Sequence, residues 1–357
     1  MEIGLGVYTG ECMDAEGVTP TEVLRDSLTQ ARLAEQVGLD VVWISEHHFL
    51  PNGYVGSVLP FAAAMGAVTS SIGIGVSVAL APLYDPVRLA EDAAFVDVLT
   101  GGRFQLGVAL GYRDVEYEGF QTTRRDRVGR TEELCQLLRQ CWGPGELDFD
   151  GRHFRRHGVE VHPKPVQPGG VPLLMGGHAP KAIDRVARLA DGFIMDGGTD
   201  SDVFAEQGHN RDLFDRVETA FGMYREALAR HGRPTERPRF YLTLGGFLAD
   251  DGPDAAWELV QDAYMYTRRV YGDWYGLAPE EYERWYPELM PPEEHARRRT
   301  EIWLGGPDDL IPRFERLRDI TDDSIHVMFR SKYPGVPDGA TRRSIELLGK
   351  VRDHFRG

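Results

Sequence analysis

The sequence predicts an α/β protein, a (β/α)8 TIM barrel with an insertion before its last strand. Short apolar segments rich in valine and isoleucine alternate with amphipathic helical segments along the 357 residues, an alternation typical of a parallel sheet. Polar or glycine-containing loops follow the apolar segments, at the strand ends where such barrels carry their functional groups. A chain of this length can form one barrel, so we expect a single domain over 1–357.

The first half of the chain contains four strand–helix units. Thr19 before Pro20 forms a helix start, and Gly38 ends that helix. Asp85 and Pro86 start a later helix in the same way. Strands are expected at 3–8, 40–45, 72–79 and 103–110, with helices at 20–37, 57–67, 86–99 and 126–141.

The second half contains the other four units and two departures from the rhythm. A hairpin is expected at 147–154 around Asp150 and Gly151, followed by a proline-rich excursion at 159–170. Strands are expected at 172–175, 192–195, 239–247 and 324–330, with helices at 180–190 and 203–230, from 253, from 307 and at 340–355.

An aromatic-rich segment separates the seventh strand from the eighth, and we interpret it as an insertion at about 264–300. Eight tyrosines and tryptophans fall within 23 residues: Tyr264, Tyr266, Tyr271, Trp274, Tyr275, Tyr282, Trp285 and Tyr286. The sequence leaves three roles open. The segment is a lid over a hydrophobic substrate pocket, a dimer face, or a packed insertion without a direct role.

Composition restricts the class of protein. The net charge of -16 argues against binding to nucleic acid or to anionic membranes. The three cysteines form no CxxC pair, which fits a reducing compartment. Neither a signal peptide nor a transmembrane run is recognisable, so we expect a cytoplasmic protein.

The segment 40–59 carries the residues best suited to a catalytic role. An apolar strand ends in Ser45-Glu46-His47-His48-Phe49 and thereby places titratable groups at the carboxyl end of a parallel strand. Adjacent residues of an extended segment point to opposite sides, so we expect the two imidazoles to act on different atoms. A structural role for either histidine remains open. Since no HExxH or similar spacing is present, we predict no metal site.

Two glycine-containing strand ends are candidate cofactor contacts. The run 176–180, Gly-Gly-His-Ala-Pro, joins a strand to a helix N-terminus, where exposed amides and the helix dipole favour a phosphate. The run 107–113 ends the fourth strand without opening a helix, so it does not indicate a dinucleotide fold; it suits the edge of a flat ligand. Ordinary tight turns and strand packing explain both runs equally well.

Taken together, these stretches resemble the bacterial luciferase-like family of flavin-dependent oxidoreductases. The resemblance is closest in 38–120, through EHHF, DPVRLAED and GGRF, and resumes at 171–194 and more loosely at 304–317. It implies a (β/α)8 barrel, usually dimeric, with reduced flavin at the carboxyl ends of the strands. The aromatic segment has no counterpart.

The resemblance also implies roles for individual residues. His47 matches the first histidine of EHHF and is therefore the expected catalytic residue. The pair Ser77-Val78 matches a non-prolyl cis peptide beneath the flavin, and the expected phosphate seat is Gly176, Gly177 and His178. Arg330, at the end of the eighth strand, is expected to meet substrate or flavin, and His48 is a further expected substrate contact. Independently of the resemblance, the aromatic segment offers Trp274 and Tyr275 as substrate contacts if it is a lid.

Leu110 is a departure from the family pattern. Bacterial luciferase has an arginine there that interacts with the flavin phosphate, so we expect Tyr112 or Arg113 to replace that contact. Light emission with a long-chain aldehyde is therefore not inferred. The glycine- and glutamate-rich pattern of the deazaflavin dehydrogenases is not found after the fourth strand, which favours FMN.

The expected function is that of a monooxygenase. Reduced FMN, supplied by a separate flavin reductase, and oxygen would oxygenate an apolar or ring-bearing substrate, with an imidazole as acid or base. Two alternatives remain: a deazaflavin-dependent hydride-transfer enzyme and a non-catalytic flavin-binding barrel. We expect a homodimer.

Overall fold

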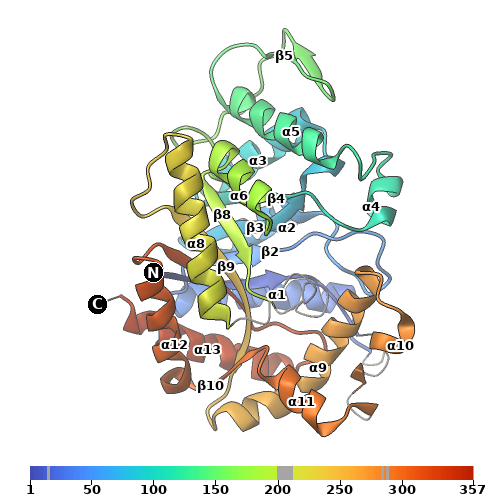
Figure 1. Cartoon of the computed structure of the whole chain (residues 1–357), viewed down its shortest axis with the longest axis vertical. Helices are drawn as coiled ribbons and strands as arrows, with labels where there is room; N and C mark the ends of the chain where they lie inside the picture. The colour runs from blue at the N-terminus through green and yellow to red at the C-terminus, as the bar shows by residue number, and fades with distance from the viewer. Residues whose placement is uncertain (14–16, 199–211, 283–284, 287–288, 357) are drawn as a thin grey trace.

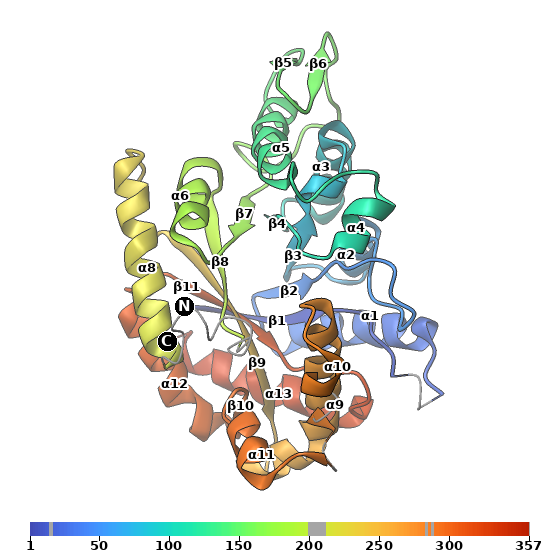
Figure 2. The same cartoon turned by 45° about the vertical axis from the view of Figure 1, so that its right-hand side comes forward.

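The computed structural model describes residues 1–13, 17–198, 212–282, 285–286 and 289–356. Its centre is a barrel of parallel strands, closed by the pairing of β11 with β1 and of β8 with β9 (Figures 1 and 2). The wall consists of β1 (Glu2–Tyr8), β2 (Val41–Ile44), β3 (Gly73–Leu80), β4 (Phe104–Ala109), β7 (Leu173–Gly176), β8 (Gly192–Asp196), β9 (Arg239–Leu248) and β11 (Ile325–Arg330). The predicted (β/α)8 barrel is confirmed.

Helices follow the strands and cover the outside of the barrel. Thr19 forms the expected cap of α1, where its side chain accepts a hydrogen bond from the amide of Glu22, and Asp85 caps α3. The helices are α1 (Pro20–Gln36), α2 (Val58–Val68), α3 (Pro86–Thr100), α4 (Asp114–Gly119), α5 (Arg127–Trp142), α6 (Pro180–Leu189), α8 (Leu213–Arg230), α9 (Pro253–Trp274), α10 (Pro279–Tyr282), α11 (Pro292–Arg299), α12 (Pro307–Ile320) and α13 (Asp338–His354).

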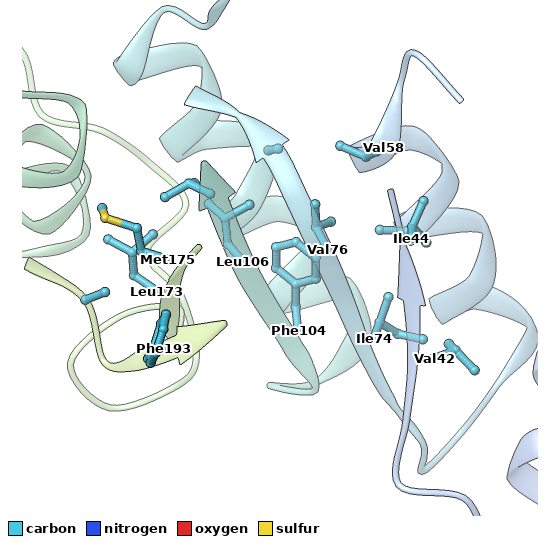
Figure 3. Packing of buried hydrophobic residues seen from close by; sticks show 14 of the residues in the cluster. Val42, Ile44, Val58, Ile74, Val76, Phe104, Leu106, Leu173, Met175 and Phe193 are labelled. Atoms are coloured by element: carbon cyan, nitrogen blue, oxygen red, sulfur yellow. The ribbon is translucent and has the colours of Figure 1, made fainter. Parts of the chain in front are cut away.

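Alternate residues of each strand separate two regions of packing. The outward set packs against the helices; Figure 3 shows Val42 and Ile44 of β2 and Ile74 and Val76 of β3 near Val58 of α2. This layer between strands and helices holds most of the buried apolar side chains. It explains why the strands are apolar on both sides of the pleat, as expected of a buried parallel sheet.

A single large side chain occupies much of the barrel interior. Trp43 points inward from β2 and meets Tyr241 of β9 across the barrel, with the ring centroids 5.6 Å apart. A Cβ atom added to Gly75 would lie 2.2 Å from Trp43 Cε3, and one added to Gly4 would lie 2.7 Å from Trp43 Nε1. The volume of this indole therefore requires glycine at positions 4 and 75.

A second hydrophobic cluster lies outside the barrel wall, in the segment between β9 and β11. It joins α9 to the aromatic segment through Trp257, Tyr264, Met265 and Trp285. A short strand, β10 (Trp303–Gly305), extends this segment by pairing in parallel with the end of β9. The cluster thus has its own apolar core beside that of the barrel.

The structure adds detail to the sequence predictions in several places. The aromatic-rich segment interpreted as an insertion at about 264–300 starts within α9, which continues without a break to Trp274, and its interpretation as an insertion stays a prediction. The hairpin strands are β5 (Asp148–Asp150) and β6 (Arg155–His157), so 151–154 forms the turn. Helix α4 and strand β10 were not predicted. The predicted helix 203–230 is α8 from residue 213 onward, and its first part lies outside the described residues.

Candidate functional site

The loop after β2 carries the first part of the candidate site. His47 is buried, with 6% of its surface exposed, and its Nδ1 lies 3.0 Å from Glu116 Oε1 on α4. The same oxygen accepts the backbone N–H of His48 at 3.0 Å and Arg113 Nη1 at 3.1 Å. Burial raises the pKa of Glu116, but the bonds from His47, His48 and Arg113 outweigh it, so the pKa lies below its ordinary value.

The second histidine belongs to a different network. His48 Nε2 lies 2.8 Å from Glu46 Oε1, which also accepts the hydroxyl of Tyr84 at 2.6 Å. Glu46 Oε2 accepts the backbone N–H of Leu80 at 2.6 Å and so ties the loop after β2 to the end of β3. The two imidazoles therefore have separate carboxylate partners, as an extended segment predicts. The substrate role of His48 stays a prediction.

Aromatic rings surround the imidazole of His47, and we call this set the aromatic cage. Its members are Tyr54, Tyr112, Tyr271 and Trp274, with ring centroids 5.0, 5.6, 6.4 and 4.6 Å from that of His47. The hydroxyl of Tyr112 lies 3.4 Å from His47 Nε2. Both nitrogens of the ring thus have a polar neighbour inside an otherwise apolar wall.

The end of α9 closes over the cage. Trp274 contacts the imidazole, and the guanidinium of Arg113 lies 4.7 Å from the centre of its ring. Tyr275 stacks on Tyr112, with centroids 4.9 Å apart and an interplanar angle of 23°. Of the two aromatic residues that the sequence singled out as substrate contacts, Trp274 therefore lies against His47, and Tyr275 lies against Tyr112 of the cage.

A polar cluster lies beside the cage, at the ends of β1 and β11. Arg330 Nη2 lies 3.3 Å from Glu11 Oε2, and Asn52 Nδ2 lies 3.3 Å from Glu11 Oε1. Burial disfavours the charge of Arg330, but Tyr271 and Glu11 outweigh it and raise its pKa. The hydroxyls of Tyr54 and Tyr271 are 3.2 Å apart, so this cluster is continuous with the cage.

The predicted cofactor contacts lie at the ends of β3, β4 and β7. The Ser77–Val78 peptide is cis, at a point where the register of β3 against β4 shifts. Leu110 follows β4, and its carbonyl accepts the hydroxyl of Tyr117 at 2.7 Å. Because β3, β4 and β7 are neighbours in the sheet, their carboxyl ends face the same mouth of the barrel.

The predicted phosphate seat joins β7 to α6. Gly176 ends the strand, and a Cβ atom added there would meet no atom closer than 3.7 Å. Gly177 is different, because a Cβ atom there would lie 2.6 Å from the Cβ atom of Ala182. His178 follows in the turn, and the N-cap residue Ala179 gives the helix no side-chain cap. The N-cap residue thus contributes no side chain to the first amides of α6.

Sequence reasoning missed several residues that contact His47 or its neighbours. Glu116 was not singled out because it lies 69 residues from His47 on α4, a helix of six residues that is too short to show periodicity. Tyr54 was not singled out because its loop shows no periodic pattern. The only sequence signal for Glu116 was its place shortly after the fourth strand. In the described ranges, no helix is long and apolar enough to cross a membrane, and no group of three or more potential ligand residues is arranged to hold a metal ion.

Comparison with known proteins places this site in a family context. The family model for luciferase-like monooxygenases matches residues 3–324. Among curated proteins, an alkanal monooxygenase alpha chain of Photorhabdus laumondii is 27% identical over 175 residues, 49% of each chain. An F420-dependent glucose-6-phosphate dehydrogenase of Nocardia farcinica is 33% identical over 193 residues, 51% of this chain and 56% of the relative. The chain thus spans about half the length of these curated relatives.

Solved structures agree in fold over the whole chain. Monooxygenase RslO1 from Streptomyces bottropensis superposes with a TM-score of 0.82 at 19% identity, covering 99% of this chain and 100% of that one. The oxygenating constituent of 3,6-diketocamphane monooxygenase from Pseudomonas putida, solved with FMN, gives a TM-score of 0.74 at 17% identity and covers 98% of both chains. With its closed barrel and a family match over nearly its full length, this chain belongs to the luciferase-like monooxygenase family of oxidoreductases, whose relatives use FMN or coenzyme F420.

Proposed function

We propose that this protein is a flavin-dependent monooxygenase that uses reduced FMN and oxygen to oxygenate an apolar or ring-bearing organic substrate. The observation that supports this most directly is the imidazole of His47, held by a buried carboxylate inside the aromatic cage at the carboxyl end of the barrel. A titratable group in a largely apolar enclosure suits proton transfer in a site from which water is excluded.

The residues at the mouth fit an FMN. Backbone and small side chains of Ser77 and Val78, together with Leu110 and Tyr112, would contact the flat ring system. Gly176, Gly177 and His178 would hold the phosphate, because a glycine strand end leads directly into the N-terminus of α6, whose N-cap residue Ala179 has no capping side chain. When bound in its reduced form, FMN supplies the two electrons for the reaction, and a separate flavin reductase would renew them.

The chain's own residues have three tasks in this reaction. One oxygen atom of O2 enters the substrate and the other leaves as water, so protons must be delivered in the absence of bulk solvent. His47 holds or moves a proton at Nε2, the nitrogen that faces Tyr112. Trp274 and Tyr275 cover the imidazole and exclude water, and Arg330 beside the cage provides a polar contact for a substrate oxygen.

A hydride-transfer function with F420 is the second candidate. The similarity to an F420-dependent glucose-6-phosphate dehydrogenase supports it, because the same fold region would accept a deazaflavin. In that reaction a hydride passes between substrate and coenzyme without oxygen. The same histidine would then hold the proton that accompanies the hydride.

Anaerobic titration separates these functions. We expect the purified protein to bind reduced FMN more tightly than reduced F420, and to produce, on mixing with oxygen in a stopped-flow spectrometer, a transient absorbance distinct from both free forms of FMN. Immediate reoxidation without a transient, or preferential binding of F420, would contradict the monooxygenase proposal. His47→Ala is the matched control for FMN binding, since this substitution removes the imidazole and leaves the phosphate seat of Gly176, Gly177 and His178 unchanged.

We also propose that the protein forms a homodimer through α2 and α3. The sequence of α2, VLPFAAAMGAV, contains no polar side chain although the helix lies on the outside of the barrel. It packs against α3, whose Phe95, Val98 and Leu99 are 60%, 42% and 48% exposed (Figure 1). Adjacent apolar helix faces of this kind are characteristic of subunit interfaces. In a twofold dimer, α2 and α3 of each subunit would be covered by the same helices of the partner.

A further inference from the structure

The two adjacent histidines contact their carboxylates through different ring nitrogens. His47 uses Nδ1 toward Glu116, whereas His48 uses Nε2 toward Glu46. A neutral imidazole carries its single proton on one nitrogen and a lone pair on the other. The identity of the paired nitrogen therefore determines where each ring can accept a proton.

The surroundings of Glu116 determine which partner donates in its contact with His47. Glu116 Oε1 already accepts a backbone N–H from His48 and a guanidinium N–H from Arg113, groups that can only donate. An oxygen that accepts two such bonds cannot itself be the donor to a third group. The proton between His47 and Glu116 therefore resides on Nδ1, whether or not the carboxyl group is ionised.

The contacts of Glu46 give His48 the opposite tautomer. Glu46 accepts the hydroxyl of Tyr84 and the backbone N–H of Leu80, so it is an acceptor toward Nε2 as well. Nδ1 of His48 is then left with its lone pair, next to Gly56, where an added Cβ atom would lie 3.1 Å away. Glu46 thus holds the second ring in the other tautomer.

We propose that Glu116 is a positioning residue that fixes His47 as the Nδ1–H tautomer, so that the lone pair of Nε2 faces the aromatic cage, while Glu46 fixes His48 as the Nε2–H tautomer. In this state Nε2 of His47 accepts a hydrogen bond from the hydroxyl of Tyr112 and can take a proton from a group bound in the cage. The imidazolium formed in that way is stabilised by the carboxylate of Glu116, whose pKa lies below its ordinary value because of its three donors.

Arg113 strengthens this arrangement because it contacts three parts of the site. Its Nη1 donates to Glu116 and, at 2.8 Å, to the carbonyl of His48, and its guanidinium covers Trp274. Arg113 thereby links the carboxylate of Glu116 on α4 to the ring of Trp274 on α9. The inference rests on the proposed function only in its statement that His47 moves protons; the tautomers themselves follow from the contacts.

The test is long-range 1H–15N correlation spectroscopy on protein labelled with 15N in its eleven histidines. This measurement distinguishes the two neutral tautomers by the shifts of the ring nitrogens and needs neither substrate nor cofactor. His47→Asn and His48→Asn assign the two signals by their disappearance. We expect the Nδ1–H pattern for His47 and the Nε2–H pattern for His48 in the wild-type protein.

Substitutions at Glu116 then identify the cause. Glu116→Gln keeps an oxygen that can accept the same donors, so we expect the Nδ1–H pattern to persist. Glu116→Ala removes the acceptor, and we expect His47 to shift to the Nε2–H pattern while the His48 signal stays unchanged. A stopped-flow comparison of reduced FMN reoxidation in the same variants reports the effect on the reaction separately.

Two results would overturn the inference: an Nε2–H pattern for wild-type His47, or persistence of the Nδ1–H pattern in Glu116→Ala. If the alanine variant does not fold, the wild-type spectrum still decides, because the tautomers of the two adjacent rings are predicted to be opposite. Failure of the proposed function alone would leave the spectra as predicted and change only the reaction with oxygen.

Discussion

Replacement of Phe95 by arginine should separate the proposed homodimer into monomers. Phe95 lies on α3 and is 60% exposed, although it is a large apolar side chain on a helix that neighbours the wholly apolar α2. In a twofold interface each copy of the ring is covered by the partner. Arginine at this place would bring an unpaired charge into the covered surface of both subunits.

The magnitude follows from the exposed area. A phenylalanine side chain buries roughly 150–250 Å², so the exposed 60% amounts to about 100–150 Å². At about 25 cal/mol per Å² its burial contributes roughly 3 kcal/mol per copy, or about 6 kcal/mol for the symmetric pair. A loss of that size raises the dimer dissociation constant about 10⁴-fold, before any unfavourable contribution from the buried charge.

Sedimentation equilibrium over a range of concentrations measures this change directly. We expect a dimer for the wild-type protein and a monomer for Phe95→Arg at micromolar concentration. Leu259→Arg is the matched control, because Leu259 is 42% exposed on α9, away from α3, and its replacement should leave the dimer intact. A monomeric wild-type protein, or a Phe95→Arg variant as dimeric as the wild type, would refute the reasoning.

Three further predictions concern Trp274, the exposed turn between α2 and β3, and the barrel interior. Trp274→Ala should make the caged imidazole react several-fold faster with diethyl pyrocarbonate, measured by mass spectrometry of the modified peptide; an unchanged rate would argue against the covering role. Glu35 accepts three backbone N–H groups of the α2–β3 turn, and these bonds outweigh the effect of burial and lower its pKa to about 2. Glu35→Ala should reduce the free energy of unfolding by about 2 kcal/mol at pH 7. This difference from the wild type should diminish as pH falls from 4.5 toward 2, because the carboxyl group of Glu35 takes up its proton in the unfolded state before it does so in the folded state. Urea titrations at several pH values test both points. Gly75→Ala forces a methyl group to within 2.2 Å of Trp43 and should cost about 2–3 kcal/mol of stability, whereas Gly339→Ala, where no atom lies within 4 Å, should cost nothing in thermal unfolding.

Local sequence patterns were sufficient for the barrel because each strand–helix unit carries its own signals. Thr19, Asp85 and the glycines that end helices fix the boundaries within a few residues, and the alternation of units predicts a parallel sheet. The aromatic composition starts at residue 264, inside α9, where the helical periodicity does not change, so the insertion at about 264–300 stays a prediction. Strand β10 escaped prediction because three residues are too few to show a pattern.

The candidate site was predictable only in part, because its contacts join distant segments. His47 was identified from its place at the end of a strand, but its partner Glu116 lies 69 residues further along the chain. The sequence assigned Glu46 no definite partner, and the structure pairs it with His48. A lid role for Trp274 stays a prediction; it is supported by the distance of Trp274 from His47, which no pattern along the chain contains.

The separate apolar core formed by Trp257, Tyr264, Met265 and Trp285 has a consequence for how this protein diversifies. These side chains pack on one another, on the end of β9, and on Tyr333 and Val336 after β11. Because they form a cluster apart from the main core, the unit that supplies Trp274 and Tyr275 can open locally while the barrel stays intact. In hydrogen exchange, α9 to α11 would then exchange as one cooperative block of lower stability. Variation within that block is free to alter which molecules enter, without repacking the wall that holds His47.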